Sequence, residues 1–259
     1  MASTATGARA AQPIGPVVAL LLMPLAFLLV ALAGTVALRW GLVGVAVAQV
    51  AAFALPAWLA ARRPGPPAAV LALVRPPGRA LVGGLLLAVS FWYLSAALLA
   101  PLVEDLVTER ETELLADHFF GPEPLAVKLA VLALVPALCE EILVRGAIAR
   151  GLRPRLGLFG AALLSSIYFA ALHGSLARLP ITFLLGIVLA VATLRSGSLV
   201  PAILIHAGNN AAAVLLTQPQ LAGAAELLGQ QGALALPVAA LASGIGLALV
   251  WRSAPPGSD

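Results

Sequence analysis

The chain has 259 residues, of which 61% are hydrophobic and only 10% are charged, and its mean hydropathy is +1.04. A water-soluble protein of this size could not cover so much apolar surface, so the composition excludes a soluble domain and indicates an integral membrane protein. The formal net charge is +4, carried by fourteen arginines and a single lysine. Basic loops beside membrane spans explain this charge, so we expect a lipid bilayer and no nucleic acid as partner.

Apolar stretches of about 20 residues, the length needed to cross a bilayer, recur along the chain between short polar or Pro/Gly-containing breaks. We predict an all-α polytopic bundle of about eight transmembrane helices. The spans are expected near 17–38, 42–61, 80–102, 125–149, 158–174, 179–194, 199–217 and 233–251. The expected organisation is therefore a tail at 1–16, one integral membrane domain at 17–251 and a tail at 252–259. The Pro/Gly stretch at 62–67 is predicted to be a loop.

Basic residues lie mostly on one side of this eight-helix layout, as expected for cytoplasmic loops. On the side of the N-terminus lie Arg9, Arg62, Arg63, Arg75, Arg79, Arg150, Arg153, Arg155, Arg195 and Arg252. Opposite them are only Arg39, Arg110, Lys128 and Arg178. We predict that both termini are cytoplasmic. The abundance of Arg, Ala, Gly and Pro fits a GC-rich bacterial genome, so the expected location is the inner membrane of a bacterium. The acidic loop 103–124 then faces outward and can form a short surface helix.

The fourth predicted span contains three ionisable side chains, each of which disfavours insertion by about 2.5–3.5 kcal/mol at mid-membrane. Glu141 and Arg145 are four residues apart, so they share a helix face and can form an ion pair. Glu140 points about 100° away and has no partner on its own helix, so it must find one elsewhere or take up a proton. Glu140 is therefore the reactive candidate, and a purely structural buried network is the alternative.

Histidines in two other spans offer such partners. His173 follows Phe169 by four residues and His206 precedes Asn210 by four, so each pair projects from one helix face. The third histidine, His118, lies in the loop 103–124. A lone membrane histidine is usually a packed core residue, but here the polar residues gather in spans four, five and seven. This pattern predicts a shared polar cavity.

These motifs resemble the CAAX protease and bacteriocin-processing family (CPBP or Abi) of type II CAAX endopeptidases. Its motif EExxxR is present at 140–145, FxxxH at 169–173 and HxxxN at 206–210, in the family's order. The resemblance covers about residues 125–217, while the other spans match only in being hydrophobic. Val144 stands where many members have Phe, a difference that we expect to affect packing alone.

The resemblance implies a CAAX-protease-like helical bundle with glutamic endopeptidase activity inside the membrane. Its substrates would be membrane-associated or C-terminally anchored proteins or peptides. Glu140 would act as general base and, beside His173, activate the attacking water. His206 and Asn210 would form the oxyanion hole, in which one donor is worth about 2.7–4 kcal/mol.

The remaining motif residues have supporting roles in this interpretation. Glu141 and Arg145 would hold the site in shape. Phe169 would contact the substrate, with ordinary packing as the alternative. Asn209 is expected to pack or to bond elsewhere, and Cys139, the only cysteine, to be a small buried hydrophobe.

Two other functions remain open. Two glutamates and two histidines are acceptable zinc ligands, and the family has often been labelled metalloprotease, although the chain has no HExxH motif. We therefore predict no metal ligand and no cofactor, with a zinc-dependent protease as the alternative. Buried Glu and His also form proton relays, so a proton-coupled transporter or a non-catalytic scaffold is the alternative outside proteolysis. No inverted repeat, which would favour transport, is visible.

Overall fold

The computed structural model describes residues 12–109, 112–113, 121–221, 223, 226 and 232–254. Most of the predicted N-terminal tail, the end of the C-terminal tail, and His118, Arg9 and Arg110 lie outside these residues. In the described part of the chain, all regular secondary structure is helical, which confirms the all-α prediction. With η marking π-helical and 3-10 segments, the elements are α1 Pro16–Gln49, η1 Val50–Ala54, α2 Leu55–Ala61, α3 Pro67–Val70, α4 Gly78–Val103, η2 Glu104–Leu106, α6 Leu125–Lys128, η3 Leu129–Leu134, α7 Val135–Glu141, η4 Ile142–Ala149, α8 Arg150–Leu172, α9 Leu179–Ser196, α10 Val200–Leu216, η5 Pro219–Leu221 and α12 Gly232–Trp251.

Five helical stretches of the described residues are long and apolar enough to cross a membrane. They are Pro16–Thr35, Arg39–Ala61, Gly78–Leu106, Leu179–Ser196 and Leu234–Trp251. The shorter apolar helix α10 corresponds to the predicted span 199–217. The predicted spans 125–149 and 158–174 are helical but do not qualify as long uniform helices, because π-helical segments divide the first and a kink separates the second from the preceding turns. The fold is thus an all-α membrane bundle in which five of the eight expected spans meet this criterion.

Two breaks between predicted spans coincide with glycines in an unusual backbone conformation. Gly41, inside α1, has φ of 56°, and Gly157, inside α8, has φ of 66°. Positive φ is strained for residues with a Cβ atom, so glycine is the residue that turns the chain here. At these two points the chain passes from one predicted span into the next.

Two of the π-helical segments end just before a proline. Pro56 follows η1, and Pro136 follows η3, each as one of the first residues of the next α-helix. Because proline has no N–H, the carbonyl four residues before it loses its α-helical partner, and the next N–H lies five residues away. A five-residue hydrogen-bond spacing is that of a π-helix, a feature frequent at functional sites. The prolines therefore account for widened turns on either side of the site described below.

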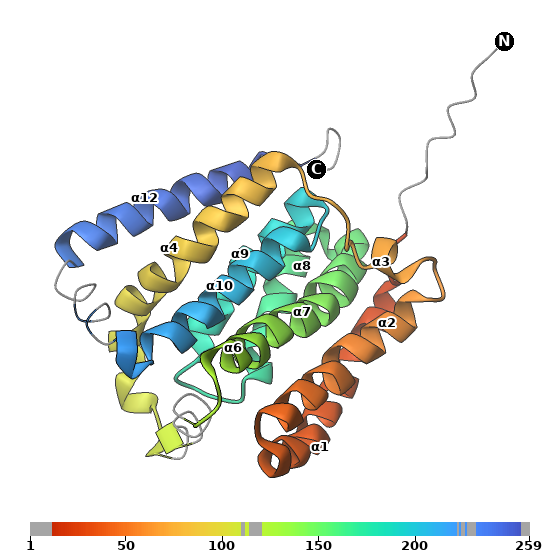
Figure 1. Ribbon diagram of the computed structural model, residues 1–259. Coiled ribbons are helices and arrows are strands. Elements are labelled where there is room, and N and C mark those ends of the chain that lie inside the picture. Colours follow the sequence, from red (N-terminus) through yellow and green to blue (C-terminus); the bar gives the residue numbers. More distant parts are fainter. Residues whose placement is uncertain are drawn as a thin grey trace.

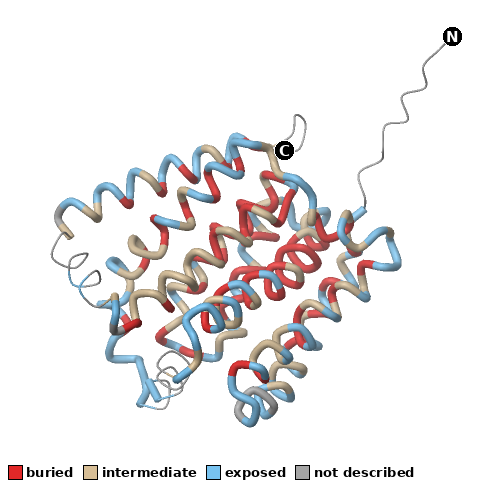
Figure 2. The backbone as a smooth tube through the Cα atoms, viewed as in Figure 1, coloured by how far each residue is buried: buried red, intermediate tan, exposed pale blue. Residues whose placement is uncertain are grey.

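The helices form a bundle in which α10 occupies an inner position (Figure 1). Helices α12, α4, α10 and α7 lie side by side, the α1–α2 pair packs beyond α7, and α8 and α9 lie behind. Burial is highest around the α7–η4 helix and α9 (Figure 2). In α9, 61% of the span is buried, against 17–28% in the other four qualifying spans. The outer helices thus face the lipid, and the inner ones enclose the polar residues.

Small residues bring neighbouring helices close together, which is common where membrane helices associate. A Cβ atom added to Gly208 of α10 would lie 2.7 Å from the carbonyl oxygen of Ala88 in α4. A Cβ atom added to Gly83 of α4 would lie 2.6 Å from the carbonyl oxygen of Gly246 in α12. These contacts fix α4 between α10 and α12.

Three of the arginines predicted to share one side of the membrane bind backbone carbonyls at one end of the bundle. Arg150 donates to the carbonyl of Val70, Arg153 donates to the carbonyl of Leu194 at 2.9 Å, and Arg195 donates to the carbonyl of Trp251 at 3.0 Å. These bonds join the start of α8 to α3 and to the end of α9, and the end of α9 to the end of α12. That this end faces the cytoplasm stays a prediction.

Candidate active site

Glu141 and Arg145 form the ion pair that their spacing predicts. Arg145 Nη1 donates to Glu141 Oε1 at 2.8 Å, and neither side chain is exposed at all. Glu141 is the last residue of α7, and Arg145 lies in η4. A charged pair this deep needs further hydrogen bonds to offset its desolvation, and Arg145 makes one, to the carbonyl of Gly186. Its Nε, and Oε2 of Glu141, are buried without a hydrogen-bond partner among the described residues.

Arg145 connects three helices. Its Nη2 donates to the carbonyl of Gly186 in α9 at 3.2 Å, and its guanidinium lies 4.2 Å from the ring centroid of Phe169 in α8. Gly186 permits this arrangement, because a Cβ atom there would lie 2.9 Å from the Cβ of Ser166 in α8. Arg145 is thus held by a carboxylate, a carbonyl and an aromatic face, all of them buried.

His206 of α10 faces both glutamates. Its Nδ1 lies 2.9 Å from Oε1 of Glu141, and its Nε2 lies 3.8 Å from Oε2 of Glu140. Because an ionised carboxylate only accepts hydrogen bonds, Nδ1 carries a hydrogen. Nε2 is therefore an acceptor when the imidazole is neutral and a donor when it is protonated. The sequence analysis did not predict this link between His206 and Glu141.

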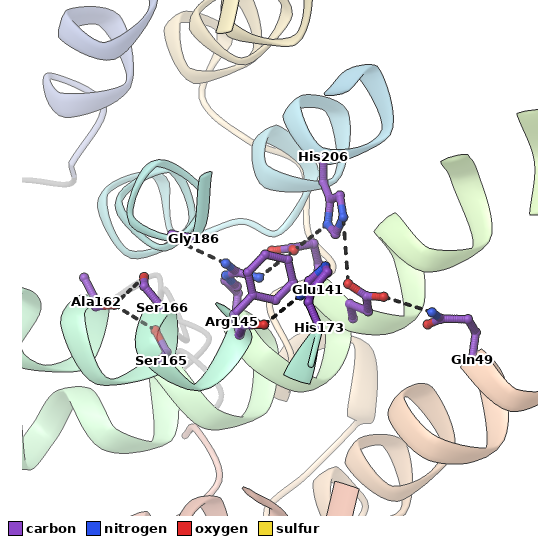
Figure 3. A network of polar contacts seen from close by, with 11 residues as sticks. Gln49, Glu141, Arg145, Ala162, Ser165, Ser166, His173, Gly186 and His206 are labelled. Atoms are coloured by element: carbon purple, nitrogen blue, oxygen red, sulfur yellow. Dashed lines mark hydrogen bonds and ion pairs between the residues drawn. The ribbon is translucent and has the colours of Figure 1, made fainter. Parts of the chain in front are cut away.

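Glu140 finds its partners on two other helices, as expected from the lack of one on its own. Gln49, the last residue of α1, donates from Nε2 to Glu140 Oε1 at 2.9 Å, and His206 faces Oε2. Glu140 is 8% exposed. Figure 3 shows Gln49 approaching the site from the side opposite to Arg145 and Gly186. Glu140 is thus a buried carboxylate with no arginine or lysine bonded to it among the described residues.

Gln49 was missed by the sequence analysis. It is the one side chain in the predicted span 42–61 that is neither apolar nor small, and this exception could have identified it as a site residue. A polar residue inside a membrane span is costly unless it has a partner, so it marks a functional position by default.

Phe169 and His173 lie one turn apart, as predicted. Their rings meet edge to face at 4.8 Å, and Phe169 makes the same kind of contact with His206 at 5.6 Å. His173 Nδ1 is 2.9 Å from the carbonyl oxygen of Phe169, so it donates there and leaves Nε2 as an acceptor. Phe169 is 1% exposed, and its contacts are those of the packing alternative.

Asn210 lies one turn beyond His206 on α10 and is partly buried. Its Oδ1 accepts from Nδ2 of Asn209 at 3.4 Å, which leaves its own amide hydrogens without a bonded acceptor among the described residues. Asn209 thus bonds to its neighbour, in line with the prediction. Among the described residues, the one hydrogen bond of the Asn210 side chain is to Asn209, and neither glutamate shares it.

The acidic and imidazole side chains of the site are the candidate metal ligands of the zinc-dependent alternative. Among the described residues, no group of three or more His, Cys, Asp or Glu side chains is arranged to hold an ion. One oxygen of Glu141 is bonded to both Arg145 and His206, and one oxygen of Glu140 is bonded to Gln49. Cys139 is buried and unbridged, as expected of a packing residue.

Comparison with known proteins gives one match. The family model for Rce1-like type II CAAX prenyl endopeptidases matches residues 122–212. The matched residues contain all three motifs but not Gln49. No curated protein and no solved structure matches the chain. The resemblance to the CAAX protease family is confirmed for this segment, which holds the inner part of the bundle.

Proposed function

We propose that the chain is an intramembrane endopeptidase in which Glu140 activates the attacking water. The proposal rests on the match of residues 122–212 to the family model of Rce1-like type II CAAX prenyl endopeptidases. The family is one of peptidases acting in membranes. The finer proposal concerns which residues perform the hydrolysis and on what class of substrate.

The observation that carries the proposal is the difference between the two adjacent glutamates. Glu141 is bonded to Arg145 and His206 and is inaccessible. Glu140 is bonded to a neutral amide on one oxygen, and its other oxygen faces Nε2 of His206 across 3.8 Å. A general base must have an oxygen available to water. Glu140 meets this requirement, and Glu141 holds the imidazole and the arginine.

Hydrolysis then proceeds in two steps, addition of water and collapse of the tetrahedral intermediate. Glu140 takes a proton from water while the water oxygen bonds to the scissile carbonyl carbon, and the C=O electron pair moves onto the carbonyl oxygen. In the second step the C=O bond re-forms, the C–N bond breaks, and the proton on Glu140 passes to the leaving nitrogen. His173, whose Nε2 is free to accept, holds the second hydrogen of the water.

The oxyanion of the tetrahedral intermediate is stabilised by protonated His206 and by the amide of Asn210. With both glutamates ionised, Arg145 offsets one negative charge, and His206 offsets the other when its imidazole is protonated. Transfer of the water proton to Glu140 as the oxyanion forms leaves the total charge unchanged. A neutral total matters in a low-dielectric site, where an unbalanced charge is costly.

The proposed substrates are membrane-associated or C-terminally anchored proteins and peptides. The site residues lie on helices of the bundle, so a scissile bond must enter the bundle to reach Glu140. The family's name refers to prenylated tails, and both prenylated and unmodified C-terminal peptides are therefore the substrates to test.

The test is cleavage of internally quenched peptides, with and without a farnesylated C-terminal cysteine, by the protein in proteoliposomes. We expect the wild type to cleave at least one peptide, and Glu140→Gln to reduce kcat by about a hundredfold to ten-thousandfold. Glu104→Gln, a change of the same kind at an exposed position in η2, is the control and should be as active as wild type. Wild type that cleaves no peptide, or Glu140→Gln at full activity, would contradict the proposal.

A further inference from the structure

The helix pair α1–α2 contributes a polar group to the site although it lies outside the matched residues 122–212. Gln49 closes α1 and is followed directly by η1, which packs against α7, the helix that carries Glu140. The π-helical segment is required by Pro56, so the wide turn that follows Gln49 is set by the local sequence.

The orientation of the Gln49 amide is fixed by chemistry. Glu140 Oε1 lies 2.9 Å from the end of the side chain and can only accept when ionised, so the NH2 group must face it. The amide oxygen of Gln49 then points away from Glu140. This oxygen is buried and has no hydrogen-bond partner among the described residues. A membrane protein keeps such a group at a cost, which argues for a role beyond packing.

The two oxygens of Glu140 are distinguished by this contact. Gln49 occupies Oε1, and Oε2 is the oxygen that faces His206. A carboxylate free to rotate would present either oxygen to water. A carboxylate bonded on one oxygen presents the other in a constant direction, and orientation of the reacting group is a major part of enzymatic rate enhancement.

We propose that Gln49 is a positioning residue of the active site: it holds Oε1 of Glu140 so that Oε2 is aimed at the attacking water. This inference rests on the proposed function and adds to it a residue from the helix pair that precedes the matched segment. The same contact assigns the α1–α2 pair a part in catalysis besides its part in the bundle.

The test compares three variants of the full-length protein in proteoliposomes, with the peptide that wild type cleaves best. Gln49→Met keeps the length of the side chain and removes both polar atoms, and Gln49→Asn keeps the amide on a shorter chain. Gln218→Met makes the same change at a buried glutamine that lies just after α10. The amide nitrogen of Gln218 donates to the carbonyl of Val214 and to the hydroxyl of Thr217.

We expect Gln49→Met to lower kcat by about ten- to hundredfold, the value of a hydrogen bond to a charged group, with KM unchanged. Gln49→Asn should recover part of the loss, and Gln218→Met should leave kcat as in wild type. Equal kcat for Gln49→Met and wild type would overturn the inference. So would a loss confined to KM, or a loss of the same size in Gln218→Met.

A second measurement separates this inference from the proposed function. Thermal unfolding is compared for wild type, Gln49→Met, Glu140→Ala and the double variant. If Gln49 holds Glu140, Gln49→Met lowers Tm less in the Glu140→Ala background than in wild type. Additive effects would overturn the contact even if the protein were an active peptidase. Wild type without activity but with coupled effects would contradict the proposed function and leave the contact intact.

Discussion

Nδ1 of His206 lies 2.9 Å from Oε1 of Glu141, across 65 positions of the chain, and this contact joins α10 to the end of α7. The same oxygen accepts from Arg145, so one carboxylate oxygen fixes both a guanidinium and an imidazole. Glu141 therefore determines which nitrogen of His206 faces Glu140. Such orientation of an imidazole by a second group is a general feature of catalytic histidines.

The contact predicts a separation between stability and activity at position 206. In His206→Asn the amide nitrogen can replace Nδ1 and keep the bond to Glu141, but nothing replaces Nε2. We expect Tm close to wild type and kcat lower by about a hundredfold to a thousandfold, the value of one oxyanion donor. His206→Leu, which also removes the bond, should lower both. A fully active His206→Asn would contradict the role given to Nε2.

Substitution of Gly186 tests the contact that holds Arg145 to α9. A Cβ atom at this position would lie 2.9 Å from the Cβ and 3.1 Å from the Cα of Ser166, so Gly186→Ala must push α9 away from α8. Overpacking of this kind costs about 1–3 kcal/mol. We expect a lower Tm and a lower kcat, since the Gly186 carbonyl moves with its helix.

Gly244→Ala provides the matched control for this change. Gly244 lies in α12, and a Cβ atom there would have nothing within 4 Å. The Tm of Gly244→Ala should equal or exceed that of wild type, because alanine has a higher helix propensity than glycine. If Gly186→Ala unfolds at the same temperature as Gly244→Ala, the close approach of α8 and α9 is not needed.

Phe169 distinguishes packing from substrate contact. Its ring meets Arg145, His173 and His206 and is 1% exposed. We expect Phe169→Leu to lower the free energy of unfolding by about 1–3 kcal/mol, with KM unchanged. Phe159→Leu, at a 74% exposed position of the same helix, should leave both quantities as in wild type. A raised KM with an unchanged Tm would show instead that Phe169 contacts the substrate.

Metal removal tests the zinc-dependent alternative. One oxygen of each glutamate is already engaged with Arg145, His206 or Gln49, so we expect o-phenanthroline or EDTA to leave the cleavage rate unchanged. The rate is measured before chelation, after chelation and dialysis, and after addition of zinc. Activity that disappears on chelation and returns with zinc would establish a metalloprotease.

The contacts within one helix were predictable from the sequence, and those between helices were not. Glu141 with Arg145, and Phe169 with His173, follow from a spacing of four residues on a helix. Gln49 and Glu140 are 91 positions apart, and their contact depends on how α1 packs against α7. Hydropathy gives the length of a span but neither its rotation nor its depth, which packing determines.

The number of spans was also only partly predictable. A run of apolar residues indicates a span whether or not the helix is regular, so it does not reveal the π-helical segments η3 and η4 in 125–149. The break at Gly157 was located correctly, but the turn that it makes comes from its backbone conformation. Pro136, four residues before Glu140, was visible in the sequence. Its missing N–H explains the widened turn before α7.

The central claim is that the two adjacent glutamates divide catalysis and structure between them. The most direct measurement is kcat and Tm for Glu140→Gln and Glu141→Gln side by side. The account predicts that Glu140→Gln unfolds near the wild-type temperature with almost no activity. It predicts that Glu141→Gln is destabilised by about 3–5 kcal/mol, because Arg145 is left buried without its counter-ion. A stable, active Glu140→Gln protein, or a Glu141→Gln protein as stable as wild type, would contradict it.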